Sequence, residues 1–415
     1  MRIATVSNLY PPFTIGGYER LCGDVCSELA MLGHPVSVLT SGYGGKAPDP
    51  PGQSVSRRLR LLANESNIYE PASFSEETRR ELVDKNSAAL RSFLKRVRPD
   101  VVFAWNLYFL GAEFVSELMS QRIPVVAFLT DNWLIAAENP SAIGEFFTRF
   151  VHGPETYAAG ARLSGGADRR YAQTAIYGSQ FMLDLHRSAG FLFEHERIIH
   201  HGVRLPMVPR ELRAKRDGIG KSGAVRLLFA GRVVDVKGPQ VLLAALPRIR
   251  LALAPLDVKL TIVGDRQDVP FLQSLEAQVA GQDLGDVVTF ALPVAEDELL
   301  SLFNDHDIFV FPSLYEPFSL TLIHALASGI PTVASDAGGN VEIVSHERTG
   351  LVFERLSADQ LAAAVVRLCT DADLRDRISE TAIRVAHRFT FRRMIERLER
   401  ELGASRQTLQ PVIAD

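Results

Sequence analysis

Short apolar runs rich in Val, Ile and Phe alternate with helix-forming segments along nearly the whole chain, and this alternation restricts the fold more than any other feature. Such runs are typical of strands buried in parallel sheets that carry helices on both faces. The expected strands are residues 2–7, 35–40, 101–104, 125–129, 172–176 and 197–200 in the first half, and 225–230, 258–263, 287–291, 308–311, 332–334 and 351–353 in the second. The pattern predicts α/β architecture.

The length of the chain, 415 residues, indicates two domains rather than one hydrophobic core. The alternation stops between residues 205 and 223, where prolines and the stretch KRDGIGKSG fit neither period. We therefore expect an N-terminal domain over 1–210 and a C-terminal domain over 211–385, both doubly wound and Rossmann-like, facing a cleft between them. Residues 386–415 are expected to form a helix that crosses back to the first domain, followed by a polar tail.

Composition narrows the class of protein. Hydrophobic residues make up 47% and charged residues 23%, as in ordinary folded domains, and the net charge of -4 does not favour nucleic acid as a partner. Three cysteines, no export signal and no apolar run of about 18 residues predict a cytoplasmic protein that touches the inner membrane face at most peripherally. Two basic clusters are the candidates for such contact, although a solvated helix face is the favoured alternative: Arg57, Arg58 and Arg60, and Arg91, Lys95, Arg96 and Arg98.

Two cations follow the expected strand 225–230. Gly231 and Arg232 come directly after it, and Lys237 and Gly238 precede a helix that begins near Pro239. Ligands of open parallel sheets lie outside the carboxyl ends of the strands, glycines let the backbone come close, and Arg and Lys suit phosphate oxygens. The loop therefore predicts a diphosphate site with exposed Arg and Lys side chains, against the alternative of a merely solvated surface loop.

An acid follows the expected strand 308–311 and stands just ahead of a helix. Glu316 can accept hydrogen bonds from sugar hydroxyls, and Ser319 is the expected N-cap of the helix. The backbone amides of Phe318, Ser319 and Leu320 would face an anion or sugar oxygens. The alternative for Glu316 is an acid that caps its own helix.

In their order along the chain, these and several other segments resemble the retaining, family-4 type of glycosyltransferase. The matching pieces are IGGYER (15–20), GHPVSVLT (33–40), HHGV (200–203), GRVVDVKG (231–238), IVGD (262–265), FVFPSLYEPFSL (309–320) and ASDAGGNVEIV (334–344). The resemblance covers nearly the whole chain. It implies the GT-B fold, in which two Rossmann-like domains face a cleft and the C-terminal domain binds a nucleotide sugar.

The resemblance also implies roles for single residues. Arg232 and Lys237 would hold the donor diphosphate and stabilise the leaving nucleotide, and Glu316 would contact the hydroxyls of the donor sugar. Gly16 and Gly17 would approach the diphosphate from the opposite domain. Their alternative role is a plain loop that turns into a helix.

This sequence departs from the family pattern at two places. His324 stands where a second Glu usually accepts hydrogen bonds from the ribose, and eight residues of helix would let Glu316 and His324 face one cleft. Thr130 stands where a His usually contacts the donor sugar. The next residue, Asp131, is expected to hold an acceptor hydroxyl, and its alternative role is to cap the following helix.

These observations predict a retaining glycosyltransferase that moves a sugar from a nucleotide-diphosphate sugar to a hydroxyl on a glycan, a lipid-linked or a small-molecule acceptor, in polysaccharide, glycolipid or glycoconjugate biosynthesis. We expect no cofactor and no metal, because no carboxylate-rich metal site such as Asp-x-Asp at a strand end stands out and Arg232 and Lys237 can neutralise the diphosphate. The alternatives are a catalytically impaired partner subunit that binds a nucleotide sugar, favoured by His324 and Thr130, and a nucleotide-sugar epimerase on a related scaffold.

Overall fold

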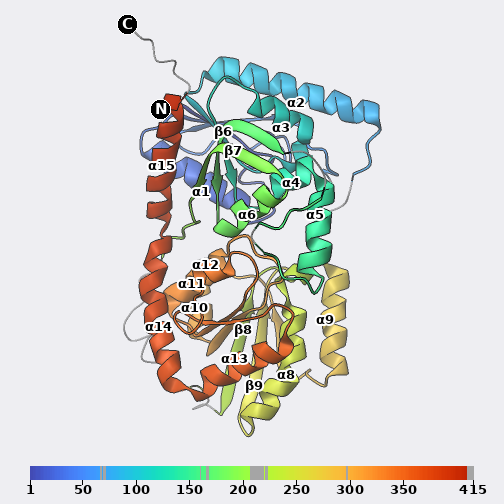
Figure 1. Ribbon diagram of the computed structural model, residues 1–415, viewed down its shortest axis with the longest axis vertical. Helices are drawn as coiled ribbons and strands as arrows, with labels where there is room; N and C mark the ends of the chain where they lie inside the picture. Colours follow the sequence, from blue (N-terminus) through green and yellow to red (C-terminus); the bar gives the residue numbers. More distant parts are fainter. Residues whose placement is uncertain are drawn as a thin grey trace. The chain divides into compact units, whose positions relative to one another are not determined.

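The computed structural model describes residues 1–65, 68, 72–158, 160–164, 168–205, 219, 223–295 and 298–408. The chain divides into two compact units (Figure 1). Unit 1 comprises Met1–His200 and Met394–Asp415, and unit 2 comprises His201–Arg393. The changes of unit therefore fall at 200/201 and 393/394, whereas the sequence analysis placed its boundaries at 210/211 and 385/386. Most of the stretch where the sequence pattern stops, and the expected polar tail from residue 409, lie outside the described residues.

Unit 1 is built on a seven-stranded sheet in the order β3-β2-β1-β4-β5-β6-β7, and every neighbouring pair is parallel. Its strands are β1 (Ile3–Val6), β2 (Val36–Ser41), β3 (Gln53–Leu59), β4 (Val101–Ala104), β5 (Val125–Leu129), β6 (Arg169–Tyr177) and β7 (Phe191–Ile198). The helices are α1 (Gly17–Met31), α2 (Glu76–Val97), α3 (Ala112–Met119), α4 (Trp133–Glu138), α5 (Pro140–Phe146), α6 (Gln180–Ser188) and the larger part of α15 (Phe391–Thr408).

The two edge strands of this sheet differ from the sequence expectation. No strand was expected at β3, and the strand expected at 197–200 is in fact β7, which begins at Phe191 and ends at Ile198. Both edge strands carry charged residues in place of a continuous apolar run. The inner strands β1, β4 and β5 are buried throughout, which is why their positions were readable from hydrophobicity.

The last helix, α15, packs within unit 1 along its C-terminal part. Its Glu399 Oε1 lies 2.8 Å from His34 Nε2, and the Ser405 and Thr174 hydroxyls lie 3.2 Å apart. Arg397 Nη2 donates to the carbonyl oxygen of Ile198 at 2.6 Å. This part of α15 thereby contacts three separate segments of the first unit. None of the described helices is both long enough and apolar enough to cross a membrane.

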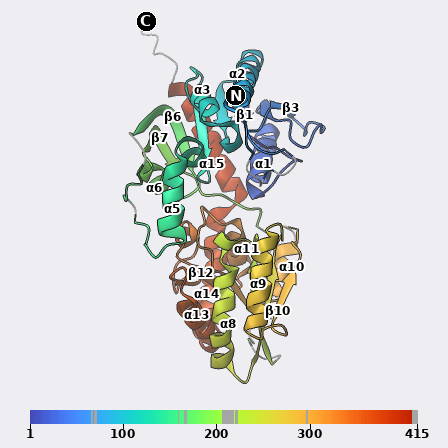
Figure 2. The ribbon, with the colours of Figure 1, turned by 90° about the vertical axis from the view of Figure 1, so that its right-hand side faces the viewer.

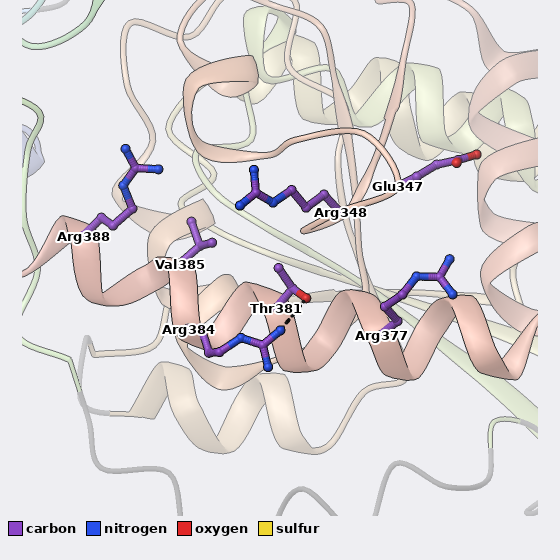
Figure 3. Close-up of a pocket in the computed structure, with 7 residues that line it drawn as sticks. All are labelled: Glu347, Arg348, Arg377, Thr381, Arg384, Val385 and Arg388. Atoms are coloured by element: carbon purple, nitrogen blue, oxygen red, sulfur yellow. Dashed lines mark hydrogen bonds between the residues drawn. The ribbon is translucent and has the colours of Figure 1, made fainter.

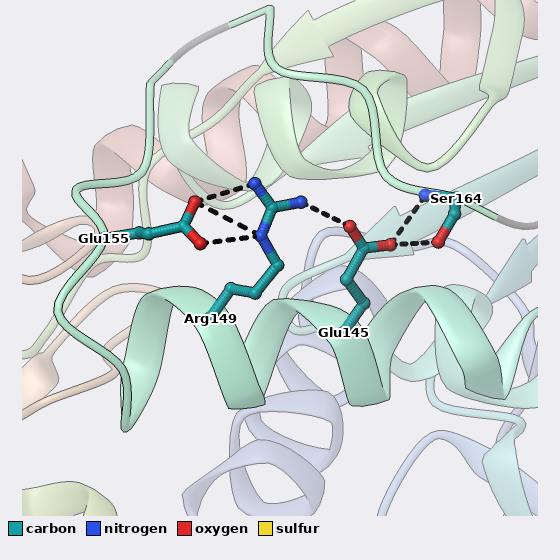
Figure 4. A network of polar contacts seen from close by, with 4 residues as sticks. All are labelled: Glu145, Arg149, Glu155 and Ser164. Carbon is teal, nitrogen blue, oxygen red and sulfur yellow. Dashed lines mark hydrogen bonds and ion pairs between the residues drawn. The ribbon is translucent and has the colours of Figure 1, made fainter.

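A polar network fixes the loop that follows α5 in unit 1 (Figure 4). Arg149, in the π-helical turn η2 (Phe147–Val151), donates to Glu145 on one side and to both carboxylate oxygens of Glu155 on the other. Glu145 also accepts from the backbone amide and the hydroxyl of Ser164, and these hydrogen bonds are the main reason that its pKa is lowered. The network ties both ends of an exposed loop to one helix.

Unit 2 is built on a six-stranded parallel sheet in the order β10-β9-β8-β11-β12-β13. Its strands are β8 (Ala224–Ala230), β9 (Asp257–Val263), β10 (Val288–Ala291), β11 (Ile308–Phe311), β12 (Thr332–Ser335) and β13 (Leu351–Phe353). The helices are α8 (Pro239–Leu253), α9 (Val269–Gly281), α10 (Leu299–Asn304), α11 (Leu320–Ser328), α12 (Asn340–Ile343), α13 (Ala358–Thr370) and α14 (Ala372–Ala386).

Helices cover both faces of the second sheet. α8 contacts α9 and α13, whereas α11 contacts α10 and α14 (Figure 2). Alternate residues of β8 explain this division, because Leu228 and Ala230 join the core under α11 and α14. From β8 the chain runs outward through β9 and β10 and then returns to begin again at β11. The strand order therefore reverses between β8 and β11, which is the place where open α/β sheets bind their ligands.

Candidate functional site

The loops that follow β8 and β11 meet at the point where the strand order of unit 2 reverses. The two strands are hydrogen-bonded neighbours and parallel, so their carboxyl ends lie at one edge of the sheet. The backbone amides of Leu314 and Tyr315, after β11, donate to the carbonyl oxygen of Val236, after β8, at 2.8 and 3.3 Å. Two segments almost eighty residues apart in sequence are thus joined through their backbones.

The centre of this edge is an ion pair between Lys237 and Glu316. Lys237 Nζ donates to Glu316 Oε2 at 2.6 Å, and the side chains are only 15% and 7% exposed. The prediction of an exposed Lys237 is therefore wrong, because the local sequence does not reveal this partner. Two protons of the ammonium group and the second carboxylate oxygen make no further hydrogen bond to a described residue.

Arg232 differs from Lys237 in its surroundings. Its side chain is exposed, as predicted, and it makes no ion pair with any residue that the structure describes. An unpaired guanidinium and a partly paired ammonium in the same loop after β8 leave positive charge at the carboxyl end of that strand. This positive charge can bind an anion.

The two glycines of the loop after β8 have different roles. Gly238 has a φ of 73°, and a Cβ there would lie 1.9 Å from the carbonyl oxygen of Pro312, so both its conformation and the close packing of the two loops require glycine. At Gly231 a Cβ would make only ordinary contacts, the nearest 3.7 Å from Phe229 Cζ. Packing within the unit therefore does not explain Gly231, and its role in binding a donor stays a prediction.

Helix α11 begins beside Glu316. Ser319 is its N-cap, as predicted, and its hydroxyl accepts from the amide of Leu322 at 3.1 Å. Phe318 has its ring packed between His201 and Phe389 in the hydrophobic core, so only its backbone is suited to a ligand. Leu320 is the first helical residue, where backbone amides have no carbonyl partner within the helix itself.

His324 lies on α11 but Glu316 does not. The helix begins at Leu320, so Glu316 belongs to the preceding loop and the spacing of two helical turns assumed from the sequence is wrong. The residue His324 is only 7% exposed. A ribose contact by His324 stays a prediction.

A set of buried polar residues that the sequence analysis did not single out holds the Glu316 loop in place. Asn340 Nδ2 donates to Ser313 Oγ at 3.0 Å, and Ser335 Oγ donates to the Ser313 carbonyl oxygen at 2.5 Å. The amide of Gly339 donates to the Glu316 carbonyl oxygen at 2.8 Å. The only sequence signal was the segment AGGN after an apolar strand, which formed part of the family resemblance but carried no assigned role.

The predicted residues of unit 1 also lie near one another. Gly16 is the N-cap of α1 and Gly17 its first residue, and Tyr18 follows. Burial is the main cause that raises the pKa of Tyr18, and the nearby charge of Asp131 adds to the rise. A Cβ at Gly17 would meet no atom within 4 Å, so packing in unit 1 does not require this glycine. Thr130, also predicted to matter, is buried beside Asp131.

Asp131 takes part in local structure. Its Oδ1 accepts from the amide of Trp133, the first residue of α4, at 2.9 Å, and its Oδ2 lies 3.5 Å from Asn106 Nδ2. The helix-capping alternative is therefore present in the structure. A contact between Asp131 and an acceptor stays a prediction.

The basic cluster Arg57, Arg58 and Arg60 of unit 1 lines a hollow of about 730 Å³, to which Lys46 also contributes. Arg57 has a structural role there, because its guanidinium donates to the carbonyl oxygens of Tyr10 and Pro11 at 3.2 and 2.5 Å. Burial lowers the pKa of Arg57. Arg58 and Arg60 are exposed. Elsewhere in the described parts of the chain, no group of three or more His, Cys, Asp or Glu side chains is arranged to hold a metal ion.

The fold and this site define the class of protein. Two doubly wound units with parallel sheets, one of them carrying paired cations and an acid where its strand order reverses, form the GT-B fold of two Rossmann-like domains. The family model "Glycosyltransferase Family 4" matches residues 15–205, and the model "Glycosyl transferases group 1" matches residues 213–385. The chain belongs to the family-4 glycosyltransferases, and it is a glycosyltransferase.

Individual relatives agree with this assignment. A glycogen synthase of Mycobacterium tuberculosis (strain CDC 1551 / Oshkosh) is 28% identical over 382 residues, which cover 89% of this chain and 86% of the relative. The sucrose-phosphate synthase of Thermosynechococcus elongatus superimposes with a TM-score of 0.73 at 20% identity, over 97% of this chain and 99% of its own. The Anabaena protein HepE, solved in complex with UDP-glucose, gives a TM-score of 0.66 at 19% identity over 97% and 100% of the two chains. The structural likenesses show the fold.

Proposed function

We propose that the chain transfers a sugar from a nucleotide-diphosphate sugar to a hydroxyl acceptor with retention of configuration and without a metal ion. The observation that carries the proposal is the Lys237–Glu316 pair, held with Arg232 where the strand order of unit 2 reverses. At this edge of the sheet, cations that can bind the diphosphate lie beside an acid that can bind the sugar hydroxyls. The complex of HepE with UDP-glucose supports a donor of this kind on the same fold.

The two cations neutralise the diphosphate as the sugar bond breaks. Arg232 offers a guanidinium fork to the phosphate oxygens, and Lys237 adds a point charge that is already fixed by Glu316. Because these groups are in place before charge develops on the leaving phosphate, they stabilise the transition state without reorganising. The same two charges take the role that a divalent cation has in metal-dependent transferases.

Glu316 orients the sugar. The carboxylate oxygen that does not contact Lys237 accepts from a hydroxyl of the donor sugar, which fixes the ring relative to the diphosphate. The acceptor oxygen then attacks on the face that the phosphate leaves, and the phosphate takes the proton of the acceptor. No step requires a glycosyl-enzyme intermediate. Catalysis comes from position and from charge stabilisation.

The acceptor belongs to unit 1 in this proposal. Asp131 holds its hydroxyl, whereas Gly16 and Gly17 of the same unit leave room for close backbone approach to the donor diphosphate. The cationic hollow beside Arg58 and Arg60 favours an acceptor that carries a negative group, whether a glycan, a lipid-linked sugar or a small molecule. A screen that compares neutral and phosphorylated acceptors tests this point, because equal rates with both would remove the role of the hollow.

The test of the function begins with a thermal-shift screen of nucleoside diphosphates and their sugars, since a ligand that binds the folded chain raises Tm. With the donor found, Arg232→Gln should lower kcat/KM by roughly 100-fold to 1000-fold, as removal of a preorganised charge does. Arg250→Gln removes an exposed arginine from α8 and should leave the rate unchanged.

Further measurements separate the parts of the proposal. The anomeric configuration of the product, read by NMR, should match that of the donor, and EDTA should not change the rate. An inverted product would refute retention, and activity lost to EDTA and restored by a divalent cation would refute metal independence. A nucleotide sugar that changes configuration without an acceptor would favour an epimerase.

A further inference from the structure

Unit 2 carries a second cationic site, in a hollow of about 490 Å³. Four arginines line it, from two segments that face one another: Arg348 comes from the turn that precedes β13, and the others come from α14 and the residues just after it (Figure 3). The complete lining is Glu347, Arg348, Arg377, Thr381, Arg384, Val385 and Arg388.

The positive charge of this hollow is largely uncompensated. Arg348, Arg377 and Arg388 form no ion pair with any residue in the described part of the chain. Arg384 lies 3.9 Å from Glu380, but both side chains are well exposed, so this pair is weak. The single acid of the lining, Glu347, is committed to a hydrogen bond from Arg367, which is the chief cause of its lowered pKa.

A constrained turn presents Arg348 to the helix. Glu347 has a φ of 58°, in the left-handed region that residues other than glycine seldom adopt. Its amide donates to the Gly350 carbonyl oxygen at 2.8 Å, and the amide of Arg348 donates to the Ser345 carbonyl oxygen at 3.1 Å. The side chain of Arg348 then extends over α14 toward Arg388 (Figure 3). The arrangement is thus fixed by backbone hydrogen bonds rather than by a partner for the guanidinium.

We propose that this hollow binds a small phosphate ester. Guanidinium groups on opposing walls match phosphate oxygens in geometry as well as in charge. Val385 is the one apolar side chain of the lining, so neither a nucleobase nor an acyl chain finds a surface to pack on. The Thr381 hydroxyl and the Glu347 carboxylate oxygen that does not accept from Arg367 suit the hydroxyls of a polyol or sugar that carries the phosphate. A concave site with two walls favours such a molecule over a flat membrane surface.

This site is separate from the proposed donor site. The turn that holds Arg348 leads into β13 and so lies at the amino end of that strand. Lys237 and Glu316, by contrast, follow the carboxyl ends of β8 and β11 in the same parallel sheet. The two sites share no residue, although Phe389, the neighbour of Arg388 in the sequence, packs against Phe318 near Glu316. The hollow therefore goes beyond the proposed function.

The test is calorimetric titration of the full chain with glycerol 3-phosphate and with glucose 6-phosphate, using glucose as the uncharged control. Loss of two guanidinium contacts in Arg348→Gln/Arg388→Gln should raise Kd about tenfold or more. Arg348→Lys/Arg388→Lys keeps the charge but removes the fork, and should give an intermediate Kd. The matched control is Arg248→Gln/Arg250→Gln on α8, which removes the same net charge from the same unit and should leave Kd unchanged.

Each other outcome overturns the proposal. Binding of neither ester, or an equal loss of affinity in both pairs of variants, would show that the hollow is not a specific site. Affinity lost instead in Arg232→Gln would place the phosphate at the donor site. Sedimentation with phosphatidylserine vesicles that depends on Arg348 and Arg388, without binding of either ester, would assign the surface to a membrane. Circular dichroism of each variant checks that it is folded.

Discussion

The pairing of Lys237 with Glu316 makes a quantitative prediction, because the chain contains a matched pair in a different environment. Lys85 and Glu81 on α2 show the same Nζ to Oε distance, 2.6 Å, but their side chains are 61% and 63% exposed. The Lys237–Glu316 pair is 15% and 7% exposed. The residue types and the distance are equal, so the two pairs differ in burial and in sequence separation, which is 4 residues for Lys85–Glu81 and 79 for Lys237–Glu316.

Breaking the buried pair from one side should be costly. Removal of one partner from a fully buried ion pair destabilises a protein by roughly 3–5 kcal/mol, because the other charge stays buried without compensation. Lys237 keeps some contact with water, so we expect roughly 2–4 kcal/mol for Lys237→Met or Glu316→Gln. The double variant Lys237→Met/Glu316→Gln leaves no buried charge and should recover about half of the summed loss. Lys85→Met should have no measurable effect.

Calorimetric unfolding of the full chain measures these differences, and the transfer rate separates two roles of the pair. If the pair only held the loops together, the double variant would regain activity along with stability. A role in donor binding predicts that the double variant regains stability but stays inactive. Equal stability of Lys237→Met and Lys85→Met would refute the argument from burial, and strictly additive losses in the double variant would refute the coupling.

Three other perturbations test separate parts of the structure. Burial lowers the pKa of His186 to about 4, below that of an unfolded histidine, so the unfolded chain takes up this proton first as pH falls. Between pH 7 and pH 4, urea unfolding should therefore show that the free energy of unfolding falls by roughly 3 kcal/mol more in the wild type than in His186→Gln. Equal losses in the two proteins would contradict this. A Cβ at Gly17 or at Gly403 would meet no atom within 4 Å, so both alanine variants should keep the stability of the wild type or gain up to about 1 kcal/mol. Only Gly17→Ala should raise KM for the donor. An unchanged KM would remove Gly17 from the site. Gly339→Ala places a Cβ 2.3 Å from the Pro317 carbonyl oxygen, and this overpacking should lower the free energy of unfolding by roughly 1–3 kcal/mol. The variant should also have a lower kcat. Normal turnover would show that this contact does not position Glu316.

The sequence predicted those parts of the fold that depend on continuous apolar runs. The inner strands β1, β4, β5 and β11 are buried on both faces and stand out from their surroundings. The edge strand β3, with the sequence QSVSRRL, borders one neighbour only and tolerates polar residues, so hydrophobicity did not reveal it. Strand β7 was misplaced for the same reason, since its second half carries Glu194, His195 and Glu196.

The candidate site was predictable in composition but not in contacts. Arg232, Lys237 and Glu316 each follow an expected strand, and this position alone suggested that they share one edge of the sheet. The burial of Lys237 depends on a partner in the loop after the neighbouring strand β11, 79 residues away in the sequence, which no local pattern contains. The network of Ser313, Ser335 and Asn340 could not be predicted for the same reason, because its members belong to a loop, a strand and a helix and meet only in three dimensions.

The loops of the site are held independently of the ion pair between them. The Val236 carbonyl oxygen accepts from two amides of the loop after β11, and the Glu316 carbonyl oxygen accepts from the amide of Gly339. Gly238 packs against Pro312 with no room for a side chain. Because these backbone contacts fix the loops, Lys237 and Glu316 keep their positions. In the proposed function the Lys237 ammonium therefore donates one of its other protons to a phosphate oxygen while it stays on Glu316, and the second Glu316 oxygen accepts from a sugar hydroxyl.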